Sequence, residues 1–185
     1  MPRRRRVSVD KKNEPVQREV GANDAVDELD CPCPALDPGD WHEVESDWSD
    51  ITFIRLHIPA LFGVPLGYGK LKTRAREAAE KIGAVIPLDG MVLMGAGRLI
   101  RTVLVEAESD DKEARGLVRP RGVVFSCLFS APYGSIGRRL KETRAKAIEH
   151  YGKKPNAIWT WYLTCNKCSA PRDFETLFVA HYKRE

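Results

Sequence analysis

Residues 123–164 read VVFSCLFSAPYGSIGRRLKETRAKAIEHYGKKPNAIWTWYLT, and this stretch decides the fold. Its opening run, VVFSCLFS, is rich in β-branched and aromatic residues, which is typical of a strand. Side chains at the spacing of one helix face follow: Ile136, Leu140, Thr143, Ala147 and Tyr151. Gly152 predicts the end of that helix. Residues 157–164 and 174–182 predict two further strands, so the order is strand, helix, strand, strand.

The same order is predicted upstream of this unit. Residues 51–58 form a strand pattern, residues 70–83 an amphipathic helix, and residues 91–94 and 99–106 two more strands. Two such units of about 55 to 60 residues each indicate an internal duplication. We therefore predict an α+β fold in which two strand-helix-strand-strand units are related by a pseudo-two-fold axis. Their mainly antiparallel sheet would leave a central cleft between the halves.

Length and composition place this fold in a single domain. The chain has 185 residues and a formal net charge of +4. Residues 1–30 contain seven basic and seven acidic side chains and almost no large apolar ones, so we predict a disordered tail before a domain spanning 31–185. This domain is predicted to open with a cysteine-rich, proline-rich connector that runs to Asp50, before regular patterning begins at Ile51. No stretch approaches the roughly 20 apolar residues of a membrane helix. The basic N-terminus lacks the apolar run of a secretory signal, and we expect a cytoplasmic protein without a membrane partner.

Two pairs of cysteines predict a metal site. Cys31 and Cys33 form a Cys-x-Cys pair, and Cys165 and Cys168 form a Cys-x-x-Cys pair. Four thiolates at about 2.3 Å complete a tetrahedral structural zinc site with no open position. A redox-active or disulfide-exchanging pair and unconnected surface thiols remain the alternatives. Cys127 lies alone in a predicted strand and is expected to be a small buried apolar residue.

Aromatic residues are candidates for ligand binding. Trp159 and Trp161 project from the same face of one predicted strand, because side chains alternate along a strand. Tyr133 precedes the second helix, and Phe62 and Tyr68 lie in the matching region of the first half. Such a set can stack on a flat apolar or aromatic molecule. The alternative is that these side chains are part of the hydrophobic core.

Several short motifs resemble a known family. Residues 125–133, FSCLFSAPY, look like the strand, small residue, proline and tyrosine that lead into the second helix of the GyrI-like small-molecule-binding proteins. The chain looks still more like an uncharacterised bacterial branch often labelled "hydrolase". The shared features are a CPCP start at residues 31–34, the segment IPALFGVPL at 58–66, Lys70 with Thr73 and Arg74, and the late Cys-x-x-Cys.

This resemblance spans about residues 31–183 and implies a cradle of two units around a ligand cleft. Many GyrI-like proteins carry a glutamate on the strand lining that cleft, whereas residues 158–162 read IWTWY here. The departure favours an apolar or aromatic ligand over a polycationic one. The wider family also includes hydrolases that open strained rings in natural products, so the resemblance offers an enzymatic alternative.

Candidate catalytic residues are few. Glu106 ends a predicted strand and would activate water if it were buried, and the alternative is an ordinary carboxylate at a strand end. His57 and His181 lie in predicted strands, and nothing resembles a nucleophile elbow. A nucleic-acid contact through residues 3–6, Lys167 and Arg172 is disfavoured because the tail as a whole is neutral. We therefore predict a small-molecule-binding protein with a structural zinc site, with hydrolysis of a small electrophile in the same cleft as the alternative.

Overall fold

The computed structural model of the protein describes residues 33–62, 64–111 and 114–184. The predicted tail, residues 1–30, and the predicted metal ligand Cys31 lie outside this part of the chain. The elements in chain order are α1 (Pro38–Trp41), β1 (Val44–Asp47), β2 (Phe53–Leu61), β3 (Val64–Pro65), η1 (Tyr68–Lys70), α2 (Leu71–Glu80), β4 (Val92–Met94), β5 (Ile100–Glu106), β6 (Leu117–Val118), β7 (Gly122–Ser130), η2 (Tyr133–Ser135), α3 (Ile136–Tyr151), β8 (Ala157–Tyr162) and β9 (Glu175–Lys183).

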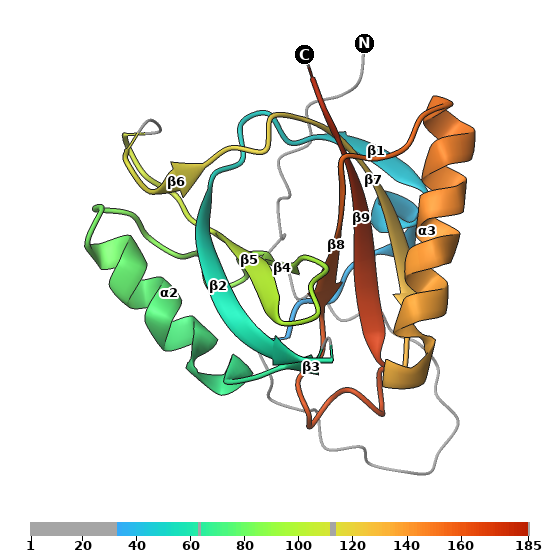
Figure 1. Cartoon of the computed structure of the whole chain (residues 1–185), viewed down its shortest axis with the longest axis horizontal. Coiled ribbons are helices and arrows are strands. Elements are labelled where there is room, and N and C mark those ends of the chain that lie inside the picture. Colours follow the sequence, from blue (N-terminus) through green and yellow to red (C-terminus); the bar gives the residue numbers. More distant parts are fainter. Residues whose placement is uncertain (1–32, 63, 112–113, 185) are drawn as a thin grey trace, which may run out of the picture.

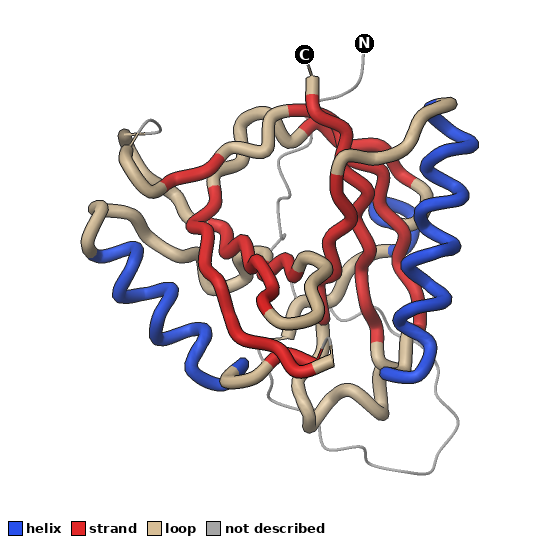
Figure 2. The backbone as a smooth tube through the Cα atoms, viewed as in Figure 1, coloured by secondary structure: helices blue, strands red, loops and turns tan. Residues whose placement is uncertain are grey.

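The strands form one curved antiparallel sheet, seen as a continuous band between two helices in Figure 2. Its order is β1-β7-β9-β8-β4-β5-β2-β3, and β6 pairs with β2. The middle six strands are arranged symmetrically: the order β7-β9-β8 of one half is mirrored by β4-β5-β2 of the other. The halves join where Met94 of β4 pairs with Thr160 of β8. The predicted α+β class and mainly antiparallel sheet are confirmed.

Each long helix covers the outer face of its own half of the sheet (Figure 1). Leu71 and Ala75 of α2 are buried against Ile58, Met94 and Val103 of the sheet. On the other half, α3 packs against β7 and β9, with Ala147 at the centre of a cluster. These burials follow from the apolar stripe that recurs every three to four residues along each helix.

Gly152 ends α3 in the left-handed conformation, with φ of 68°, and its N–H bonds the carbonyl of Ile148 at 2.7 Å. A residue without Cβ adopts this conformation at little cost, so the helix stops where the sequence predicts.

The opposite face of the sheet is covered by the segment before β2. Trp41 and Trp48 from this segment are buried with Phe53, Leu104 and Leu177 in the largest described core cluster. The sequence predicts an irregular connector here, whereas the structure shows the short helix α1 and the edge strand β1. Asp37 caps α1 by accepting the Gly39 N–H at 2.7 Å, with proline next in the chain.

Pro59 also differs from expectation. The sequence predicts that it bends or bulges the strand, yet β2 runs to Leu61 and keeps its register with β5 through Pro59. Pro59 pairs with Ile100, and its carbonyl accepts the Leu66 N–H at 2.8 Å. Proline lacks only the backbone N–H donor, and the Pro59 carbonyl still accepts a hydrogen bond within the hairpin. Among the described residues, no helix is long and apolar enough to cross a membrane.

Candidate metal centre and adjoining pocket

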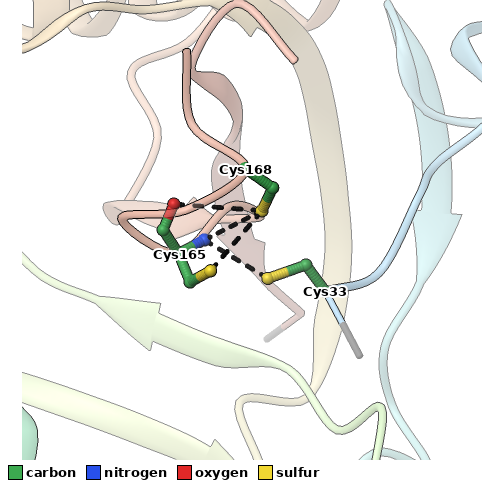
Figure 3. A group of neighbouring side chains, drawn as sticks. All are labelled: Cys33, Cys165 and Cys168. Atoms are coloured by element: carbon green, nitrogen blue, oxygen red, sulfur yellow. Dashed lines mark hydrogen bonds between the residues drawn. The ribbon is translucent and has the colours of Figure 1, made fainter. Parts of the chain in front are cut away.

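Three cysteines from distant parts of the chain meet at one end of the sheet (Figure 3). Cys33 comes from the segment before α1, and Cys165 and Cys168 come from the loop between β8 and β9. Their Sγ atoms all lie within 4.8 Å of one another. Cys168 is buried, and Cys33 and Cys165 are partly buried. The two predicted pairs are therefore brought together, at least through these three members.

The sulfurs have the spacing of metal ligands rather than of a disulfide. Cys165 Sγ and Cys168 Sγ are 3.7 Å apart, whereas a disulfide bond is about 2.05 Å long. Two thiolates bound tetrahedrally at about 2.3 Å are roughly 3.8 Å apart. The Cys165 N–H points at two of the sulfurs, at 3.2 Å from Cys33 Sγ and 3.3 Å from Cys168 Sγ (Figure 3). Such N–H donors stabilise thiolate charge.

Backbone hydrogen bonds within the loop between β8 and β9 fold it without any contribution from a metal ion. The Ser169 N–H donates to the Cys165 carbonyl at 2.9 Å, and the Arg172 N–H donates to the Cys168 carbonyl at 3.1 Å. These turns bring the two sulfurs of the Cys-x-x-Cys pair to the same side. The chain then re-enters the sheet through Asp173 and Phe174, both at positive φ.

Arg172 fastens this loop to the segment that carries Cys33. Its guanidinium donates to the carbonyls of Cys33 at 3.4 Å and Pro34 at 2.8 Å, and it pairs with the Glu175 carboxylate. A partner that orients the ligands is typical of protein metal sites. The sequence predicts Arg172 only as a possible nucleic-acid contact, so its positioning role is visible only in the structure.

This donor set fits a soft metal ion. Thiolate sulfur prefers zinc, iron or copper(I) over magnesium or calcium. The predicted fourth ligand, Cys31, is separated from Cys33 by one residue and lies outside the described residues. Three cysteines are thus close enough to hold an ion.

A pocket of about 720 Å³ adjoins the cysteines. Its lining residues come from β3, from the 3-10 turns η1 and η2 that precede α2 and α3, from the end of β8, from the loop between β8 and β9, and from the start of β9. The lining residues are Val64, Pro65, Gly69, Ala131, Tyr133, Tyr162, Thr164, Cys165, Asn166, Lys167, Ser169, Phe174 and Thr176. Cys165 is shared between the cysteine cluster and the pocket wall. The volume is within the range of small-molecule sites.

The pocket has an aromatic wall and a polar wall. The rings of Tyr133 and Tyr162 lie 6.4 Å apart at 30°, and Phe174 is nearby in the lining. The loop between β8 and β9 supplies hydroxyl and amide groups opposite. Burial raises the pKa of the Tyr162 phenol, although the neighbouring Arg101 guanidinium opposes that rise. Tyr162 is therefore protonated at neutral pH and can donate a hydrogen bond.

The predicted ligand-binding residues are placed in different environments. Tyr133, which is 80% exposed, lines the pocket. Trp161 is 5% exposed and packs edge-on against Trp41 with ring centroids 6.4 Å apart. Trp159 is partly buried against the same core cluster, so the two indoles do share a face. That face is the one covered by the N-terminal segment, and neither tryptophan lines the pocket.

The two remaining aromatic candidates lie near the β2–β3 hairpin. Phe62 is 82% exposed and is absent from the pocket lining. Tyr68 belongs to η1, but its side chain lies outside the described part of the structure. The contribution of either residue to ligand binding stays a prediction.

Glu106 does not meet the pocket. It ends β5 opposite Phe53, and its carboxylate accepts the Met91 N–H at 2.9 Å. Burial raises its pKa, as a water-activating group requires, but the lining of the described pocket does not include it. His57 is exposed on β2, and His181 is buried, with a pKa lowered by burial. Neither histidine lines the pocket.

Cys127 is confirmed as a buried small residue. It is fully buried beneath α3, and burial raises the pKa of its thiol to about 11. A thiol with a raised pKa is a poor nucleophile and a poor metal ligand. Cys127 therefore belongs to the core.

Comparison with known proteins gives a match to one family model. A family model described as "Bacterial hydrolase" matches residues 22–179. No curated protein and no solved structure matches the chain. The matched range includes all four predicted metal ligands and every described residue of the pocket lining.

Proposed function

The chain belongs to the bacterial hydrolase family, and from this premise we propose that it binds a small, largely apolar or aromatic molecule in the pocket beside the cysteines. The observation that carries this proposal is the pocket itself. It is large enough for a small molecule, and Tyr133, Tyr162 and Phe174 give it an aromatic wall. Aromatic rings bind flat apolar molecules with little loss of side-chain freedom.

We propose that the metal is zinc and that Cys31 is its fourth ligand. With Cys33, Cys165 and Cys168 it would complete a closed four-thiolate set, whose chemistry is structural. In this arrangement Cys165 holds the polar wall of the pocket in place, and Arg172 ties that wall to the N-terminal segment. Metal binding and ligand binding are coupled in this proposal.

We also propose that the two strand-helix-strand-strand units arose by duplication, as the GyrI-like resemblance implies. The mirrored strand order and the central pairing of Met94 with Thr160 support this origin. The pocket fits the proposal as well, because the segments that lead into α2 and α3, represented by Gly69 and Tyr133, face it from the two halves.

Filling the pocket tests the binding site. Gly69 lines it, and a Cβ there would meet nothing within 4 Å, so we expect Gly69→Trp to fold normally and occupy the space. The neutral fluorescent probe N-phenyl-1-naphthylamine should bind the unmodified protein at one site and bind this variant at least about tenfold more weakly. Gly137→Trp is the matched control, because it is equally open but lies outside the pocket lining. Equal probe affinity for the Gly69 variant would refute this site.

The family description favours hydrolysis as a second candidate function. Among the described lining residues there is no histidine or carboxylate, and burial raises the pKa of the Tyr162 phenol. Its phenol would donate a hydrogen bond to the carbonyl oxygen of a bound ester while water adds to the carbonyl carbon. The bond to the alcohol oxygen then breaks, and the proton lost by water passes through solvent to the alcohol that leaves. A donor placed at developing negative charge stabilises the transition state.

Turnover of p-nitrophenyl butyrate by the purified protein tests this second candidate. Tyr162→Phe should lower kcat by about a hundredfold, because it removes one donor to the transition state, and should leave probe binding unchanged. Tyr133→Phe removes a hydroxyl from the same pocket and should keep its activity. Release of p-nitrophenol at the enzyme-free rate would contradict esterase activity, and equal kcat in the Tyr162 variant would exclude its role.

A further inference from the structure

Six of the large apolar side chains that are exposed in the described structure lie on two segments whose backbones are paired with each other. They lie on the β2–β3 hairpin and on the adjoining turn between β4 and β5, and we call them the apolar tip: Leu61, Phe62, Val64, Leu66, Leu99 and Ile100. The hairpin and the turn are held together, because the Ala60 N–H donates to the Leu99 carbonyl at 2.7 Å and Pro59 pairs with Ile100. Scattered exposed apolar residues are ordinary, whereas a contiguous group marks an interaction surface.

The exposure of this group is pronounced. Phe62 is 82% exposed and Leu99 is 72% exposed. Phe62 also has a φ of 50°, a left-handed conformation that is uncommon for a bulky residue. The hairpin therefore presents the phenyl ring outward at the cost of an unfavourable backbone conformation, instead of turning it into the core.

The charged side chains of the segments that build the tip are all basic. No acidic residue occurs between Asp50 and Glu77 or between Asp89 and Glu106, which bound these two segments. Exposed bases lie close to these segments along the chain: Arg98 in the turn, Lys70 at the end of η1 and Lys72 in the first turn of α2. An apolar centre with a basic rim is complementary to a surface that is apolar inside and anionic at its boundary.

Two other occupants of the apolar tip are disfavoured: a second copy of the chain and the N-terminal residues 1–30. A second copy of the chain would bring Arg98, Lys70 and Lys72 close to the same bases of its partner, and like charges repel. Residues 1–30 offer almost no large apolar side chain with which to cover the tip.

We propose that the apolar tip inserts into the surface of an anionic lipid bilayer, with Lys70, Lys72 and Arg98 at the headgroups. The sequence predicts no membrane partner on the ground that it lacks a span of about 20 apolar residues. Shallow insertion of two short loops into a bilayer surface does not need such a span. Val64 belongs to both the tip and the pocket lining, so the pocket would open next to the bilayer. The proposal rests on the exposed surface and does not depend on the proposed function.

Vesicle sedimentation tests this surface. The full chain should bind vesicles of phosphatidylglycerol and phosphatidylcholine at least about tenfold more tightly than vesicles of phosphatidylcholine alone, and high salt should weaken that binding. Phe62→Ser combined with Leu99→Ser should reduce binding at least about tenfold. The matched control is Val85→Ser combined with Leu88→Ser, which removes two exposed apolar side chains elsewhere and should bind normally. Equal loss in both double variants would overturn the proposal.

A second measurement keeps the proposal testable if the tip variant folds poorly. Phe62→Trp places an indole at the tip, and the emission that it adds to that of the four native tryptophans should shift to shorter wavelength when phosphatidylglycerol vesicles are added. Leu88→Trp should show no shift. An unshifted Phe62→Trp spectrum would contradict insertion. A concentration-dependent dimer that the tip variant converts to a monomer would assign the surface to a second copy and refute the bilayer proposal.

Discussion

Replacing Cys165 and Cys168 with serine is expected to abolish metal binding and to lower the melting temperature by about 10 °C or more. Two of the three clustered sulfurs would be lost, and with them the link that a bound ion would make between the Cys33 segment and the β8–β9 loop, leaving only the contacts of Arg172. A link between residues about 130 positions apart restricts the unfolded chain strongly. A loss of about 3 kcal/mol corresponds to roughly 10 °C for a protein of this size. Elemental mass spectrometry and calorimetry measure the two effects.

Cys127→Ala provides the control for this experiment. It also removes a thiol, but from a site beneath α3 that is separate from the cysteine cluster. It should cost some stability through the small cavity it leaves and should keep the full metal content. If the Cys165 and Cys168 variant retained its metal, these residues would not be ligands. If it lost the metal without a change in melting temperature, the ion would not stabilise the fold.

Trp161→Ala is expected to destabilise the protein by about 3 to 5 kcal/mol, as is usual when a buried tryptophan is truncated. Trp161 is 5% exposed and packs against Trp41 within the main core cluster. Chemical denaturation measures the loss. Tyr133→Ala is the matched control, because Tyr133 is 80% exposed and should change the free energy of unfolding by less than about 0.5 kcal/mol.

The same pair of variants separates core from binding site. The structure predicts that Tyr133→Ala weakens binding of N-phenyl-1-naphthylamine, whereas folded Trp161→Ala protein keeps it. The reverse result, a stable Trp161 variant that no longer binds the probe, would return the ligand to the face of the sheet that carries Trp159 and Trp161.

Periodicity predicted the helices and strands well because their signals are local. The apolar stripe of α3 and the glycine after it set that helix almost to the residue. Short elements such as α1 and β1 were missed, since four residues carry too little periodicity and β1 exists only through its pairing with β7. Local sequence also does not show whether an aromatic side chain lies in the core or lines the pocket. Trp161 became core because Trp41, 120 positions earlier, folds over it.

The cysteine cluster was predictable for a different reason. Closely spaced thiols have few roles in a protein whose cysteines are expected to be reduced, so spacing alone suggested that the pairs meet. Their surroundings were not predictable. Arg172 contacts Cys33 and Pro34 only because the β8–β9 loop turns back on itself, and Tyr162 faces the pocket because it alternates with Trp161 on β8. The sequence predicts that Trp161 and Tyr162 point to opposite faces of β8. It does not predict which face holds the pocket, because that depends on what covers each side of the sheet.

Coupling between the metal and the pocket can be measured by titrating the unmodified protein with N-phenyl-1-naphthylamine before and after a chelator removes its metal. Cys165 belongs to both the cysteine cluster and the pocket wall, so we expect saturable binding at one site that weakens at least about tenfold when the metal is removed. Restoring zinc should restore binding. Probe affinity that is the same with and without metal, or no saturable binding in either form, would contradict a metal-supported ligand pocket.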